Sequence, residues 1–486
     1  MNKFFRYSLC LLLVGSLGLQ SCDDYFDLST NPNQVSNPPL SAMLTTATHK
    51  TGMNSYDVGS LVAPYVQYTA NPSAGGSSDT YQIVDYSGTW DALYYAMADI
   101  TDMKTAAIAQ GSSEYLGVAN VLLSYHLTLV SDLWGDAPFA EAFDPTKLTP
   151  AYESAEELYA TSLRLIDEAI TELSKTDATL NLVAGSDLIH GGDRTKWLKT
   201  AYALKARLLN KVSKTTQYNP ALVLEAVSNS YTSNADDAGM ASFVLRNPWA
   251  QVAVNNAGLT LGGWLSEQLI DHLNGTTYGV FDPRTAKITD PVALADKPDY
   301  PPYIGTVNGA GNRDNRRPSD NSLYNNTIAD ENYIADNSPW TSDTAPLWIV
   351  TYAEVKFIEA EAAFRANDLS RAYAAYLEGI RANMDKLQVP AAERDTYLVN
   401  PVVAVGAQNL TLDLIFKEKY VATYLNPEAW NDARRHDYGY QDFTLPQNAV
   451  LSTFIRRIEY PTGERSENGS NVPTVESLAD RLWWDI

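Results

Sequence analysis

The sequence has few residues suited to catalysis or metal binding. Its 486 residues include two cysteines, Cys10 and Cys22, and five histidines, with no H-x3-H or HExxH spacing among them. Histidine or thiolate ligation of a metal is therefore not expected. A G-x-S-x-G nucleophile elbow and a Walker-type phosphate loop are also absent from the sequence. These absences favour a non-enzymatic protein with no catalytic residue, cofactor or metal.

Basic residues are scarce relative to acidic ones. Lys and Arg total 35 against 58 Asp and Glu, which gives a formal net charge of −23. Such a surface repels nucleic acids and anionic membranes, so neither is an expected partner. Charged residues make up only 19% of the chain and hydrophobic residues 45%, which excludes disorder for most of its length.

The N-terminus has the pattern of an export signal. Lys3 and Arg6 precede an apolar run from Ser8 to Leu19 that is too short to span a bilayer. The sequence LQSC at 19–22 resembles a lipobox, which implies that residues 1–21 are a lipoprotein signal peptide. It further implies that Cys22 carries a diacylglycerol and an acyl chain such as palmitate. Acidic residues at 23 and 24 resemble a tag that directs lipoproteins to the cell surface.

The alternative is an ordinary signal peptidase site with an incidental cysteine. The cysteine count favours the lipobox, because Cys10 lies within the removed peptide and Cys22 is then the only thiol in the mature chain. We therefore expect a lipidated tether over 22–40, outer-membrane anchoring with exposure at the cell surface, and one domain over 41–486.

Apolar periodicity predicts a mostly α fold. Helices are expected over 57–70, 90–110, 113–131, 151–174, 194–213, 350–366, 369–387 and 410–425. Residues 231–345 are rich in Gly, Pro, Asn and Asp and predict a loop-rich insertion. Around an Asn367–Asp368 turn, the small residues Ala360 and Gly379 alternate with bulky ones in a pattern that resembles a tetratricopeptide helix pair.

Four separated stretches carry a further resemblance. They are WGDAPF at 134–139, GGDRTKWLKTAYALKARL at 191–208, YAEVKFIEAEA at 352–362, and RRIEYPTGERSEN at 456–468 with WWD at 483–485. Their order and separation resemble the SusD/RagB family of outer-membrane nutrient-binding lipoproteins, in particular its SusD-like branch. The resemblance covers essentially all of the mature chain and implies a tetratricopeptide-like helix-pair scaffold with long loop-rich insertions.

The residues of these stretches have a structural interpretation. Trp197, Ala201, Leu204 and Leu208 form one apolar stripe, and Asp193 occupies the N-cap position before it. Glu354 and Glu361, seven residues apart on one helix face, could act as an acid/base pair. We favour ion pairing with Lys205 or Arg207 across a helix contact. The residues assigned structural roles are Trp134, Asp193, Trp197, Arg207, Glu354, Glu361, Tyr460 and Pro461.

The resemblance implies that the protein captures an oligomeric nutrient and delivers it to a SusC-like, TonB-dependent β-barrel. An oligosaccharide is the first hypothesis and an oligopeptide the second; a surface hydrolase or a purely structural protein would be alternatives of another class. Sugars stack on aromatic rings, and the loop-rich segments contain eight candidates: Tyr81, Trp249, Trp264, Tyr300, Tyr303, Tyr324, Tyr333 and Trp340. Of these, Trp249, Tyr303 and Tyr81 are the predicted ligand contacts.

Overall fold

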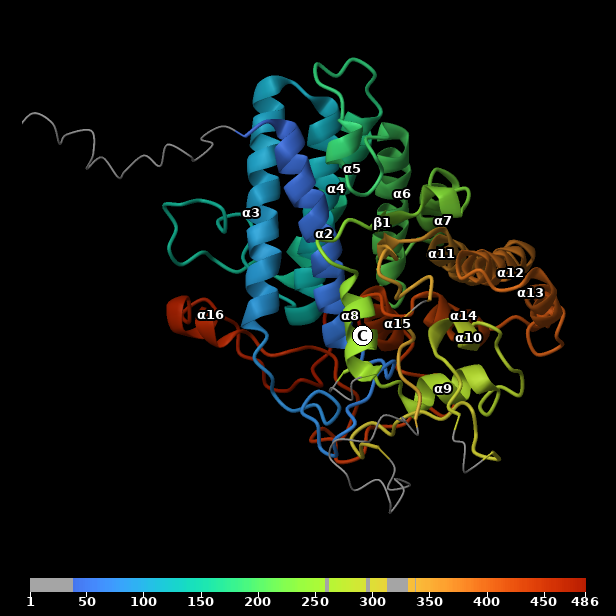
Figure 1. Cartoon of the computed structure of the whole chain (residues 1–486). Coiled ribbons are helices and arrows are strands. Elements are labelled where there is room, and N and C mark those ends of the chain that lie inside the picture. Colours follow the sequence, from blue (N-terminus) through green and yellow to red (C-terminus); the bar gives the residue numbers. More distant parts are fainter. Residues whose placement is uncertain (1–37, 258–261, 294–297, 313–330, 337) are drawn as a thin grey trace, which may run out of the picture. The chain divides into compact units, whose positions relative to one another are not determined.

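The computed structural model describes residues 38–486 except 258–261, 294–297, 313–330 and 337, and Leu40–Ile486 forms one compact unit (Figure 1). The predicted signal peptide and Cys22 lie outside the described residues. The first part of the unit is helical: α2 (Leu40–Val62), α3 (Ser87–Gln110), α4 (Ser113–Trp134), α5 (Ala155–Leu173), η1 (Ala184–Ser186), α6 (Arg194–Lys211) and α7 (Pro220–Ser228).

The remaining elements are shorter. The loop-rich insertion contains η2 (Asn234–Asp236), β1 (Ala238–Met240), α8 (Pro248–Ala257), α9 (Glu267–Asn274) and α10 (Thr285–Ile288). The last part consists of β2 (Leu347–Val350), α11 (Tyr352–Arg365), α12 (Leu369–Lys386), α13 (Ala391–Leu398), η3 (Ala407–Asn409), α14 (Leu412–Ala422), α15 (Glu428–Arg435) and α16 (Thr462–Glu467). The prediction of a mostly α fold is confirmed.

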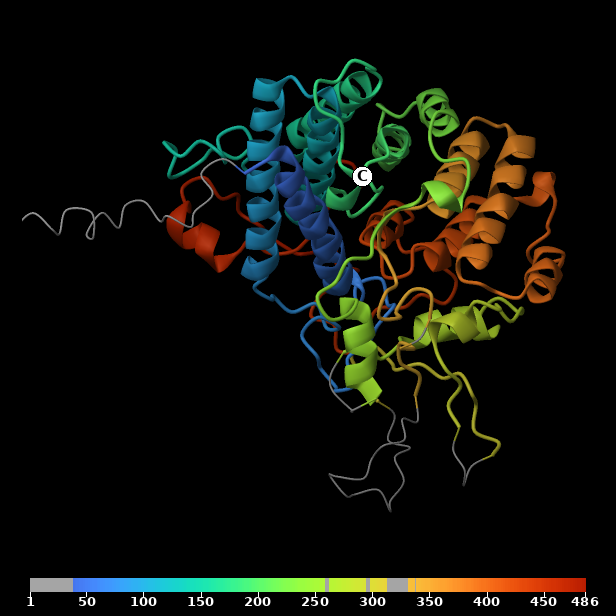
Figure 2. The ribbon, with the colours of Figure 1, turned by 45° about the horizontal axis from the view of Figure 1, so that its top comes forward.

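Helices α2 to α6 pack side by side as a first helical layer, with α4 at its centre. Helix α4 packs against α2, α3, α5 and α6, and it lies beside α2 and α3 in both views (Figures 1 and 2). All its side chains are buried except those of Glu114, Leu116 and Thr128. By length and composition α4 could span a membrane, but 89% of its apolar window is buried inside the protein. That burial is what a core helix of a folded domain requires.

Local sequence signals set several helix ends. Ser154 and Glu157 form a reciprocal capping box at the start of α5. Asp193 caps α6, as predicted, by accepting hydrogen bonds from the backbone amides of Thr195 and Lys196. Between α11 and α12, Asn367 adopts a φ of 61° and reverses the chain. These ends create antiparallel helix pairs with short connections.

The α11–α12 pair has the predicted small-against-large packing. A Cβ at Gly379 would lie 2.9 Å from the ring of Phe357, so only glycine permits this approach of the two helices. Figure 2 shows the two helices side by side. The predicted helix pair is therefore confirmed.

The first predicted helix is misplaced. The structure has a helix over Leu40–Val62, whereas 57–70 was predicted. Pro64 prevents continuation beyond Val62, and the chain turns at Gln67, whose φ is 52°. Residues 40–56 gave little sequence signal because Thr, Ser and Gly have modest helix propensity. Tertiary packing against α3 and α4 stabilises this segment.

Strands β1 and β2 form an antiparallel pair that joins the start of the insertion to its end. Ala238 pairs with Val350 and Met240 with Leu347, with a bulge after Ala238. Both strands pack on α2, where Gly52 makes room for the Met240 side chain. The insertion therefore leaves and re-enters the helical body at one place.

Irregular segments from distant parts of the sequence meet near the ends of α2 and α3, beside α8 and α9 (Figures 1 and 2). We call them the loop face, which consists of residues 68–80, 264–267, 304–312, 332–334 and 441–450. Backbone hydrogen bonds join them: Ala70 N to Trp264 O, Thr306 N to Leu265 O, Gly75 N to Gly309 O, and Gln447 N to Asn308 O, at 2.8–2.9 Å. The loops are thus held to one another much as strands are.

Replacing Trp197 by alanine is expected to lower the free energy of unfolding by about 3–5 kcal/mol, because removal of the indole ring creates a cavity in the core. Trp197 is 1% exposed, and its indole donates a 2.7 Å hydrogen bond to Asp187. Denaturant unfolding measures the loss. The control is Tyr95→Ala, which removes a side chain that is 65% exposed and should change stability by about 0.5 kcal/mol or less. Equal effects of the two substitutions would contradict the core assignment.

Candidate ligand-binding site

A polar pocket opens on the loop face at the N-terminal end of α9. Its cavity volume is about 170 Å³, well above the roughly 10–15 Å³ that a cavity needs to hold one water molecule. The pocket therefore has room for a small polar group. Its lining residues are mostly amide, hydroxyl or carboxylate bearing: Gln67, Ser266, Glu267, Gln268, Asp271, Thr277, Val307, Asn308, Asp442, Thr444, Leu445, Pro446 and Gln447.

The pocket walls are fixed by their own hydrogen bonds. The Gln67 amide donates to the carbonyl of Thr444 at 2.7 Å, and the Gln268 amide donates to the carbonyl of Gln441 at 3.2 Å. Ser266 Oγ donates to Asn308 Oδ1 at 2.5 Å. These bonds orient the lining groups before any ligand arrives, which reduces the entropy that binding would cost.

Two wall residues have unfavourable backbone conformations. Gln67 and Asp442 adopt φ values of 52° and 58°, a region that costs a residue with a Cβ about 1–2 kcal/mol. Such backbone strain persists only where surrounding structure enforces it, and it is common at ligand sites.

An aromatic pair lies near the other end of α9. The rings of Phe281 and Tyr303 are 5.7 Å apart between centroids and tilted by 49°. Phe281 is 47% exposed, and Tyr303 is half-buried. Asn274 donates hydrogen bonds to the carbonyl of Tyr303 and to the side chain of Asp271, both at 3.3 Å. Since the eight residues of α9 span roughly 12 Å, the pocket and the aromatic pair are a short distance apart.

The three predicted ligand contacts differ in placement. Tyr303 belongs to this aromatic pair. Trp249 is only 5% exposed and packs edge-on against Tyr56, and Tyr81 is completely buried next to Tyr65. Because both rings are covered by other side chains, neither Trp249 nor Tyr81 offers a ring face to a ligand in this conformation. Burial of large aromatic side chains contributes much of the stability of a core. We therefore correct these two assignments to core positions.

Sequence reasoning missed Phe281 and the pocket residues Gln67, Asn308, Asp442 and Gln447. They come from separate loops without periodicity, so no local pattern marks them. Among the described residues, no group of three or more His, Cys, Asp and Glu side chains is placed to hold a metal ion.

The model of a protein family described as "Starch-binding associating with outer membrane" matches residues 32–461. The chain belongs to this SusD-like family. A SusD/RagB family protein from Bacteroides thetaiotaomicron is 21% identical, with a TM-score of 0.72 over 92% of this chain and 99% of its own. A chitin-binding SusD homologue from Flavobacterium johnsoniae is 20% identical, with a TM-score of 0.74 over 92% and 98%. At this identity the likeness is one of fold. Comparison with curated proteins finds no match.

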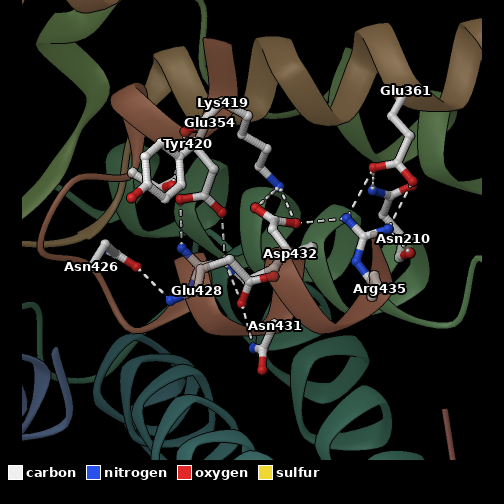
Figure 3. Close-up of polar contacts among 12 residues, drawn as sticks. Asn210, Glu354, Glu361, Lys419, Tyr420, Asn426, Glu428, Asn431, Asp432 and Arg435 are labelled. Atoms are coloured by element: carbon white, nitrogen blue, oxygen red, sulfur yellow. Dashed lines mark hydrogen bonds and ion pairs between the residues drawn. The ribbon is translucent and has the colours of Figure 1, made fainter. Parts of the chain in front are cut away.

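The second and third SusD-like stretches meet in a buried network of charges, which also takes in residues of α14 and α15 (Figure 3). Arg207 on α6 donates two hydrogen bonds of 2.7 Å to Glu354 on α11 and a third to the carbonyl of Ile349 in β2. Lys205, the other predicted partner, instead pairs with Asp167 on α5 at 2.7 Å. Arg207 therefore fastens α6 to both β2 and α11.

Glu361 has a different partner from those predicted. It accepts hydrogen bonds from Arg435 on α15 at 2.7 and 2.9 Å and from Asn210 on α6 at 2.7 Å (Figure 3). Burial alone would raise the pKa of Glu361, but the Arg435 guanidinium outweighs it and holds the pKa well below its usual value. Asp432 connects this pair to Lys419 on α14. Both Glu354 and Glu361 are about 1% exposed, and their pairing with arginine suits them to hold helices together.

The first and fourth SusD-like stretches contact each other. The Trp134 indole donates to the carbonyl of Glu459 at 3.1 Å, and the Tyr460 hydroxyl donates to the carbonyl of Asp136 at 2.9 Å. Pro461 then precedes α16. The C-terminal segment is thereby fastened to the end of α4.

Replacing Arg435 by leucine is expected to cost about 3–5 kcal/mol of unfolding free energy, because Glu361 would remain buried without its main partner. Since the folded-state pKa of Glu361 is lowered, the stabilisation is present at neutral pH and lost in acid as the pH falls through that lowered value. Unfolding by denaturant as a function of pH measures both effects. The control is Arg164→Ala, which breaks an exposed pair with Glu168 worth about 0.5 kcal/mol or less. A comparable loss in the control would refute a special role for the buried network.

Proposed function

We propose that this protein captures an oligosaccharide at the cell surface and delivers it to a SusC-like, TonB-dependent β-barrel. The observation that carries the proposal is the polar pocket at one end of α9 with the Phe281–Tyr303 pair near the other. Amide, hydroxyl and carboxylate groups suit the hydroxyls of a sugar. An exposed aromatic ring suits the C–H face of a neighbouring sugar unit.

The family supports this choice of ligand class. Its description names starch, and the Flavobacterium johnsoniae homologue of similar fold is described as chitin-binding. Oligosaccharides of glucose and of N-acetylglucosamine are therefore the first ligands to test. An oligopeptide is the alternative, and calorimetry with both classes separates them.

Binding without turnover is part of the proposal. The carboxylates of Glu354 and Glu361 are engaged by arginines inside the helical body. These two carboxylates therefore do not reach the pocket as the acid and base that a hydrolase would need. Recovery of the sugar unchanged after prolonged incubation is the expected result.

Tyr303→Ala and Phe281→Ala are each expected to weaken sugar binding about tenfold, which corresponds to about 1.4 kcal/mol. Isothermal titration with maltoheptaose, chitohexaose and a panel of short peptides measures this. Tyr95→Ala on α3, which removes an exposed tyrosine far along the chain from α9, should bind as the unaltered protein does. Binding of peptides alone, or sugar affinity unchanged by both substitutions, would reject the proposed site.

Lipid anchoring at Cys22 is the remaining part of the proposal. A diacylglycerol together with an acyl chain would give durable attachment to the outer membrane, whereas one chain holds a protein only marginally. The family description agrees in associating its members with that membrane.

Cys22→Ala is expected to move the protein from the membrane fraction to the soluble fraction. Immunoblotting after fractionation measures the distribution, and mass spectrometry of the unaltered protein should show a lipid on Cys22. The control is Cys10→Ala, which lies in the segment predicted to be removed. Retention of the Cys22→Ala protein in membranes would show that another element is the main anchor.

A further inference from the structure

One wall of the loop-face pocket depends on a tight turn at residues 307–311. Gly309 and Gly311 have φ values of 80° and 77°. A Cβ at Gly309 would lie 1.8 Å from the carbonyl oxygen of Gln447, so the turn is pressed directly against that segment. The backbone N–H of Gln447 donates a hydrogen bond to the backbone carbonyl of Asn308 at 2.9 Å. The position of the turn therefore sets both Asn308 and Gln447, which line the pocket.

A buried carboxylate, that of Asp79, accepts a hydrogen bond from this turn. Asp79 is 1% exposed, and its Oδ2 accepts the backbone amides of Asn71 at 2.8 Å and Gly309 at 3.1 Å. Its Oδ1 has no hydrogen-bond partner among the described residues. Among the described residues, Tyr81 is a titratable neighbour that responds to the charge of Asp79; its pKa is raised, chiefly by burial and then by Tyr438 and Asp79. Among the described residues no basic side chain pairs with Asp79, and its bond to the turn runs through Oδ2.

We propose that Asp79 is a positioning residue of the loop-face pocket, which holds the 307–311 turn through the Gly309 amide and so sets Asn308 and Gln447 on the pocket wall. Its effect on a ligand rests on the proposed function, but its effect on the turn does not. An ionised acceptor binds an amide about twice as strongly as a neutral one. The ionised form of Asp79 therefore holds the turn more tightly than the protonated form.

Protonation should have opposite effects on the turn and on the whole domain. Burial raises the pKa of Asp79 from 3.8 to about 6, although the backbone amides of Asn71 and Gly309 and the side chain of Asn308 act to lower it. The pKa of Asp79 is higher in the folded than in the unfolded state. Its contribution to the free energy of unfolding is therefore greatest below its unfolded-state pKa and is lost as the pH rises through about 6. In acid the domain gains stability from this residue while the turn loosens.

Hydrogen exchange tests the inference without a ligand. Asp79→Asn keeps the shape and one acceptor of the side chain but removes the charge. At about pH 7.5, amides in residues 307–311 should exchange about tenfold faster in this variant than in the unaltered protein, and at about pH 5 less than threefold faster. Amides of α4 should be unaffected at both pH values. The matched control is Asp85→Asn, which neutralises an exposed carboxylate that accepts hydrogen bonds from Ser87 and Thr462 and should leave the turn unchanged.

Three results would overturn the inference. One is equal exchange of the turn in the Asp79→Asn variant and the unaltered protein at about pH 7.5. Another is a ratio of the exchange rates of residues 307–311, variant to unaltered protein, that is the same at about pH 7.5 and about pH 5. The third is a lowered unfolding midpoint together with faster exchange in α4, which would mean that Asp79 serves the whole domain; the expected midpoint at neutral pH is equal or higher.

A sugar titration separates this inference from the proposed function. If maltoheptaose or chitohexaose binds, its affinity should be about fivefold weaker in Asp79→Asn at about pH 7.5 and equal to that of the unaltered protein at about pH 5. Unchanged affinity at both pH values would overturn the role of Asp79 in the pocket. If neither sugar binds, the oligosaccharide proposal fails, and the exchange ratio still decides whether Asp79 positions the turn.

Discussion

The buried pairing of Arg207 with Glu354, and of Arg435 with Glu361, is the interaction on which the rest of the structure depends. It joins α6 from the first helical layer to α11 and α15 from the last part of the chain. A charge buried at this depth is strongly destabilising without its partner, so arrangements of the helices that separate these pairs are disfavoured. Apolar packing alone would permit several nearby arrangements. The network thereby fixes the body that supports the loop face.

The loop face depends on this body through a few connections. Strands β1 and β2 return the insertion to α2, and Arg207 binds the carbonyl of Ile349 in β2. The same guanidinium that orders the helices therefore also holds the strand from which α11 begins. A shift between α6 and α11 would therefore displace the end of the insertion at β2.

The sequence predicts the helical body much better than the pocket. Asp193 could be identified as a cap and the α11–α12 pair as a hairpin because both depend on contacts within a short stretch of chain. The partner of Glu361 could not, because Arg435 is 74 residues away and no spacing rule selects it over Lys205 or Arg207. Residues 40–56 were missed for a related reason, since packing rather than propensity makes them helical. Tyr81 and Trp249 were assigned to the ligand from their loop context, which does not reveal burial.

The pocket was beyond prediction because its physical basis is strain enforced from a distance. Gln67, Asp442 and Asn448 all have positive φ, and an isolated chain with these residues would relax to other conformations. They stay in place because the segments bind one another, as the Gly309 turn binds residue 447 on one side and Asp79 on the other. A wall built in this way loses little freedom when a ligand arrives, so single hydrogen bonds to hydroxyls can yield useful affinity. The strained loops therefore depend on the rigid helical body, since they could not keep their conformation if the helices that support them moved.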